Sequence, residues 1–134
     1  MKYGAISAVI LSLLPVAVEA ASWEKTGRCS YLLAGKDGGF VEKSASPCLQ
    51  EFGSGTGTWA IRLTWDNGNS TLIYSDDGSG ENLILNDRPV AAWGNGIRAP
   101  DSGDYGMCYL TMIGDQPEAT CFREWGEDEA QPDY

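Results

Sequence analysis

The stretch from Thr58 to Ser75, TWAIRLTWDNGNSTLIYS, carries the clearest structural signal in the chain. Apolar residues occupy every second position in its first half, which is the period of a strand with one buried face. These residues are Trp59, Ile61, Leu63 and Trp65. Asn67-Gly68 follows, and this pair is typical of a two-residue hairpin turn because both residues accept a positive φ. The stretch therefore predicts a β-hairpin.

The same pattern predicts the register of the hairpin. Pairing outward from a two-residue turn sets Trp65 opposite Ser70, Leu63 opposite Leu72, and Ile61 opposite Tyr74. The apolar positions of both strands then share one face, and a slip of one residue would destroy that agreement.

Turn signals divide the rest of the chain into further short segments. A first hairpin is expected around Asp37-Gly38, followed by a loop over Ser44–Ser54 and a glycine-rich connector over 53–57. A short strand over 82–86, a turn over 86–89, a segment over 90–93 and a surface loop over 97–105 come next. The chain closes with a hairpin over 106–125.

No segment after residue 20 repeats apolar residues at the three-and-four spacing of a helix. Short strands separated by turns predict an all-β fold, either a small antiparallel meander barrel or a sandwich, with seven or eight strands. A barrel is favoured, because consecutive hairpins form a meander that closes easily.

Both ends of the chain differ in composition from the centre. Residues 1–20 combine Lys2, an apolar run and the small-residue pattern ending at Ala20, which predicts a cleaved signal peptide rather than a membrane anchor. The product is expected in a periplasm or outside the cell. Residues 21–125 then form a single domain, and residues 126–134 form an acidic disordered tail.

The four cysteines predict two disulfides, because their number is even and an exported chain meets an oxidising environment. Three connectivities are possible. We favour Cys29 with Cys48 and Cys108 with Cys121, since each pair brackets one predicted turn region. A four-cysteine zinc site is the alternative, but no Cys-x-x-Cys spacing supports it.

The charge balance excludes one class of partner. Nine Lys and Arg stand against 19 Asp and Glu, a net charge of −10. Binding to nucleic acid or to an anionic membrane surface needs basic side chains, so neither is expected. An acidic surface speeds the encounter with a basic partner, or it serves solubility alone.

The absence of histidine excludes Ser-His-Asp and Cys-His catalysis and every His-ligated metal site. Paired carboxylates on a glycosidic bond remain possible. However, the acids cluster among Gly and Ser in turns, at Asp76, Asp77 and Glu81 and at Asp101 and Asp104. We expect no enzyme activity, no cofactor and no metal, with calcium at these two loops as the alternative.

Five tryptophans are more than so small an interior can bury completely. Trp59 and Trp65 belong to the apolar face of the central hairpin, so we expect them inside. Trp93, Asn95, Tyr105 and Trp125 are the predicted binding residues. Separately, Asn69-Ser70-Thr71 matches the N-glycosylation acceptor pattern at a turn.

These features favour a small exported binding or inhibitory module, monomeric, that contacts a basic protein such as a lysozyme-like enzyme. A carbohydrate-binding domain and an envelope protein of another role are the alternatives. In size and class the chain is similar to the small periplasmic inhibitors of lysozyme. Their Ser-Ala-Ser-Gly loop has no match, because Pro47 follows Ser44-Ala45-Ser46, so no family membership follows.

Overall fold

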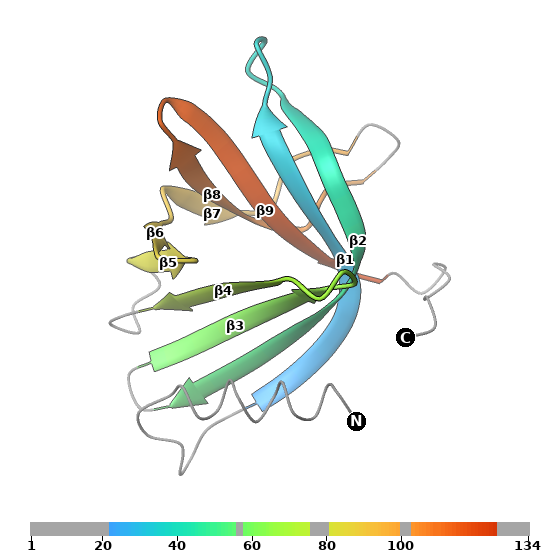
Figure 1. The fold of residues 1–134 in the computed structure, drawn as a ribbon, viewed down its shortest axis with the longest axis vertical. Helices are drawn as coiled ribbons and strands as arrows, with labels where there is room; N and C mark the ends of the chain where they lie inside the picture. The colour runs from blue at the N-terminus through green and yellow to red at the C-terminus, as the bar shows by residue number, and fades with distance from the viewer. Residues whose placement is uncertain (1–21, 56–57, 76–80, 100–102, 126–134) are drawn as a thin grey trace.

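The computed structural model describes residues 22–55, 58–75, 81–99 and 103–125, and within these ranges the chain is all β (Figure 1). Nine antiparallel strands form one sheet curled into a half-barrel. The strands are β1 (Ser22–Ala34), β2 (Phe40–Gly55), β3 (Thr58–Trp65), β4 (Ser70–Ser75), β5 (Leu83–Leu85), β6 (Arg88–Pro89), β7 (Ala92–Gly94), β8 (Met107–Ile113) and β9 (Gln116–Glu124). The predicted all-β class is confirmed, and the described strands number nine rather than seven or eight.

Several predicted features lie outside the described residues. These are the signal peptide over 1–20, the acidic tail over 126–134, part of the glycine-rich connector, and the loop acids Asp76, Asp77 and Asp101. In the part of the chain that the structure describes, no helix is long and apolar enough to cross a membrane.

The sheet is a meander whose end folds back on its beginning. The strand order is β6-β5-β4-β3-β2-β1-β9-β8-β7, and every neighbouring pair is consecutive in sequence except β1 and β9. The two outermost strands are joined by Val90-Ala91. Val90 N–H donates to Leu83 O at 2.9 Å, whereas Ala91 N–H donates to Leu110 O at 2.7 Å. The chain therefore passes from one side of the half-barrel to the other within two residues.

Gly27 marks the bend of the sheet. β1 pairs with β9 only from Gly27 to Leu33, and β2 pairs with β3 only from Cys48 to Gly55. Gly27 and Cys48 are themselves paired, so both strands change partners at the same place. A Cβ at Gly27 would lie 2.3 Å from the carbonyl oxygen of Arg123, a distance that no side chain tolerates. Glycine here permits the close approach of β1 and β9.

The loop expected over Ser44–Ser54 is wrong, because these residues belong to β2. Cys48, Leu49, Gln50 and Glu51 are all buried, so this part of the strand is covered on both faces. A strand buried on both faces lacks the alternation that marks a half-exposed one. Pro47 lies just before the pairing with β3 begins, where the strand has a neighbour on one side only.

The predicted register of the central hairpin is also wrong by one residue. Leu63 pairs with Thr71 and Ile61 with Ile73. The loop has three residues rather than two, because Trp65 N–H donates to Asn69 O at 2.8 Å. At the end of this loop, the Asn69 N–H donates to Oδ1 of Asn67 at 2.9 Å. This side-chain bond stabilises the longer loop.

The other hairpins follow their turn residues more closely. Gly38 and Gly114 have positive φ, in the turns between β1 and β2 and between β8 and β9. Asn86 and Asp87 have φ of 46° and 68°, which is the geometry of a two-residue hairpin turn. That turn is shorter than the expected 86–89, so Arg88 belongs to β6.

The two disulfides are those favoured from the sequence. Cys29 is bonded to Cys48 beside the bend, and Cys108 to Cys121 across the directly paired strands β8 and β9. All four cysteines are buried. Two disulfides indicate an oxidising, extracellular type of environment.

The sheet carries apolar clusters on both faces. On the inner face, Cys29, Leu63, Ile73, Tyr109 and Phe122 belong to one cluster, and Trp59 and Trp65 pack against it partly buried. On the outer face of β1, β9 and β8, a second cluster includes Leu32, Ala119 and Tyr105. The inner cluster fills only part of the concave face, which leaves room for a pocket.

Candidate functional site

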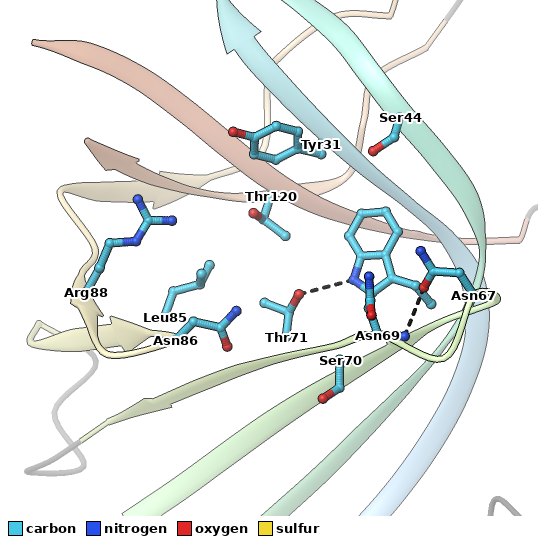
Figure 2. Close-up of a pocket in the computed structure, with 11 residues that line it drawn as sticks. Tyr31, Ser44, Asn67, Asn69, Ser70, Thr71, Leu85, Asn86, Arg88 and Thr120 are labelled. Atoms are coloured by element: carbon cyan, nitrogen blue, oxygen red, sulfur yellow. Dashed lines mark hydrogen bonds between the residues drawn. The ribbon is translucent and has the colours of Figure 1, made fainter. Parts of the chain in front are cut away.

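A pocket of about 400 Å³ opens on the concave face of the half-barrel (Figure 2). This volume is within the range of small-molecule sites. Its lining consists of neutral hydrogen-bonding side chains, two aromatic rings, one leucine and one arginine. The residues are Tyr31, Ser44, Trp65, Asn67, Asn69, Ser70, Thr71, Leu85, Asn86, Arg88 and Thr120. In a chain with 19 Asp and Glu, the lining of this pocket includes no carboxylate.

Two hairpin turns supply one wall of the pocket. The β3–β4 turn provides Asn67 and Asn69, and the β5–β6 turn provides Asn86. Because β4 and β5 are antiparallel, both turns lie at the same end of the sheet. Asn86 fixes them together, since its N–H donates to Leu72 O and its Oδ1 accepts the Leu72 N–H, each at 2.9 Å.

Strands β1, β2 and β9 supply the facing wall. Tyr31 and Thr120 are paired across β1 and β9, and Tyr31 is paired with Ser44 across β1 and β2, so the three side chains share one face. The curl of the sheet turns this face toward the two hairpin turns, as Figure 2 shows. The pocket thus depends on the β1–β9 pairing.

The hydrogen bonds within the lining leave donors directed at the pocket. The Oδ1 atoms of Asn67 and Asn86 already accept backbone N–H groups, which leaves each amide NH₂ group as a donor. The Nε1–H of Trp65 donates to Oγ1 of Thr71 at 3.1 Å and holds the indole in place. Arg88 adds a guanidinium whose side chain is 44% exposed. The site is therefore rich in donors.

Behind the pocket, a buried carboxylate holds Arg88 in position. Glu118 of β9 is 2% exposed. Its Oε1 accepts the hydroxyl of Tyr31, and its Oε2 accepts the hydroxyl of Thr111 at 2.9 Å and pairs with Nη1 of Arg88. A carboxylate with three donors is satisfied in spite of its burial.

The protonation states of this network follow from its geometry. Burial by itself would raise the pKa of Glu118, but the hydrogen bonds from Tyr31, Thr111 and Arg88 outweigh it and lower that pKa. Burial, followed by the hydrogen bond to Glu118 and its charge, raises the pKa of Tyr31 to about 12. At neutral pH Glu118 is therefore ionised and Tyr31 is a neutral donor.

None of the four binding residues predicted from the sequence lines this pocket. Trp93 is 50% exposed on β7, and Asn95 is exposed just after it. Tyr105 is 4% exposed and belongs to the outer cluster. Trp125 is partly buried. Trp23, which is not among the predicted binding residues, is 41% exposed and stacked on Phe52 with 5.0 Å between the ring centroids.

The sequence pattern of the residues that line the pocket predicts turns and strands, not a binding site. Asn67, Asn69 and Asn86 were identified as turn formers, which they are. Arg88 was assigned to a turn, and Tyr31 and Thr120 to strands. Only the closure of the sheet brings them together.

Comparison of the chain with protein-family models, with curated proteins and with solved structures gave no match.

Proposed function

We propose that this protein is a small exported binding module that takes a carbohydrate in the concave pocket. The observation that supports the proposal most strongly is the composition of the lining, in which Asn, Ser and Thr side chains surround Trp65 without a carboxylate. Sugar hydroxyls need many hydrogen-bonding groups, and an aromatic side chain supplies apolar contact with the ring.

We propose binding without turnover. Glycoside hydrolysis needs a carboxylic acid whose pKa is raised so that it can donate a proton. Glu118, beside the pocket, has a lowered pKa, and its oxygens already accept three donors. It is suited to holding Arg88 rather than to donating a proton.

Thr120 offers a clean test of this proposal. Thr120 lines the pocket, and Thr120→Val removes its hydroxyl with almost no change of volume. We expect tryptophan fluorescence titrations with mono- and disaccharides to give a Kd that the variant weakens about fivefold, the loss of one hydrogen bond. Thr64→Val is the matched control, because Thr64 of β3 lies outside the lining and its buried Oγ1 has no hydrogen-bond partner. Equal weakening by both variants, or no sugar binding at all, contradicts the proposal.

A basic protein partner is the second candidate. The net charge of −10 favours it, as do three large apolar residues displayed on the neighbouring strands β7 and β8, namely Trp93, Met112 and Ile113. Ser44–Pro47 offers no inserting loop for this role, since it lies within β2. This candidate is supported if the protein inhibits a basic lysozyme and if the inhibition weakens when salt is added and when Trp93 is replaced by Ala. Unchanged lysozyme activity at low salt contradicts it.

A further inference from the structure

The donors of the pocket are not distributed evenly, and their placement carries information about the ligand. Asn86 and Arg88 lie at one end of the pocket, next to Leu85, and Asn67 and Asn69 lie at the other (Figure 2). The first end therefore combines an amide NH₂ group with a guanidinium. Planar oxyanions are the partners that a guanidinium prefers.

Arg88 keeps donors available although it is already paired. A guanidinium has five N–H donors, and Glu118 engages it through Nη1. Glu118 is 2% exposed, whereas Arg88 lines the pocket and its side chain remains 44% exposed. The ion pair thus fixes the guanidinium in place, and a ligand at the pocket meets its remaining N–H groups rather than the carboxylate.

We propose that the ligand is an acidic sugar whose carboxylate lies against Arg88 and the amide of Asn86, with the sugar ring extending toward Trp65 and Asn67. This inference rests on the proposed carbohydrate-binding function and specifies its substrate class. The lack of carboxylates in the lining favours it, because no lining side chain repels the charge. Glu118 offsets part of the Arg88 charge, so the attraction is moderate and depends on the hydrogen bonds as well.

The test compares sugars that differ at one carbon. Methyl glucuronide is titrated against methyl glucoside, and methyl galacturonide against methyl galactoside, by calorimetry on the disulfide-bonded mature chain. We expect at least one acidic sugar to bind about tenfold more tightly than its neutral counterpart, with a preference that shrinks as salt rises. Equal affinities within both pairs overturn the inference and leave the carbohydrate proposal standing. No binding in either pair overturns both.

Two further measurements test whether Arg88 is the group that produces the preference for the acidic sugar. Glu118→Gln removes both the competing carboxylate and the ion pair that positions Arg88, so it is the reference for the double variant, and we expect it to keep a preference for the acidic sugar because Arg88 keeps its charge. Adding Arg88→Gln to that variant should abolish the preference for the acid. An acid preference that survives the double substitution overturns the assignment to Arg88. Acetate is the control for a carboxylate alone, and acetate binding as tight as that of the sugar acid contradicts the sugar. The wild-type comparison decides the inference even if a variant fails to fold.

Discussion

Arg88 reaches across the concave face of the half-barrel and pairs with the buried carboxylate of Glu118, although five strands separate β6 from β9 in the sheet. This side-chain contact connects the two walls of the half-barrel on its inner side. It also places the positive charge of the pocket.

The Glu118 network makes stability depend on pH in the acid range. Because the pKa of Glu118 is lower in the folded chain than in the unfolded one, its contribution is present above the unfolded pKa and is lost as pH falls through the folded pKa. We expect the free energy of unfolding to decrease over that interval, measured by urea denaturation at a series of pH values.

Glu118→Gln should remove this part of the pH dependence and cost roughly 1–3 kcal/mol at pH 7, since Arg88 loses its partner. Glu42→Gln is the matched control, because it breaks the ion pair with Arg28 at the surface. A pH profile of Glu118→Gln identical in slope to that of the wild type would show that Glu118 does not contribute.

Gly27→Ala should destabilise the protein by at least about 1–3 kcal/mol, the usual cost of overpacking. The added methyl group would lie 2.3 Å from Arg123 O and 2.7 Å from the Phe122 ring, so β1 and β9 must separate. The thermal midpoint measured by circular dichroism checks this. Gly39→Ala is the control, because the atom nearest to a Cβ at Gly39 is Asp37 Oδ1, at 3.4 Å, which is an ordinary contact distance. An equal midpoint shift in the two variants contradicts the account of the bend.

Each disulfide should contribute about 3 kcal/mol, because the sequence separations of 19 and 13 residues correspond to loops of moderate length. Replacing Cys108 and Cys121 together by Ala tests one bridge without leaving a free thiol. We expect a lower midpoint in urea with a folded baseline retained. A double variant as stable as the wild type would assign the bridge no stabilising effect.

Glycosylation at Asn69 should block the pocket. Asn69 is exposed, lines the pocket, and begins the acceptor sequence Asn69-Ser70-Thr71. When the chain is secreted from a eukaryotic host, we expect a glycan at Asn69, detected by mass spectrometry, and a large loss of sugar binding. Enzymatic removal of the glycan should restore binding. Full affinity with the glycan attached would place the ligand elsewhere.

Local signals in the sequence predicted the local structure well. The turns at Gly38, Asn86 and Gly114, the disulfide pairing and the antiparallel meander all follow from residues close to one another in the chain. The two wrong predictions, the loop over Ser44–Ser54 and the register of the central hairpin, have physical causes. Burial of β2 on both faces removed its alternation, and an Asn67 side-chain bond lengthened one loop by a residue and shifted its register.

The candidate site could not be predicted from residues close to one another in the sequence. Its parts come from two hairpin turns and from strands at both ends of the chain, and they meet only because β1 pairs with β9. The sequence predicts Trp93 as a binding residue, and Trp93 is 50% exposed, but no local pattern marks the concave face, where Trp65 is partly buried.

The brevity of β6 and β7 has a consequence for behaviour at high concentration. The outermost strands of the described sheet have two and three residues, so each presents very few unpaired backbone groups to a neighbouring molecule. Long free strands are templates on which other chains add and aggregate. At β6 and β7 these templates are too short for intermolecular strand addition, and the longer free edge among the described residues is β2 from Phe40 to Pro47, which pairs with β1 on one side only.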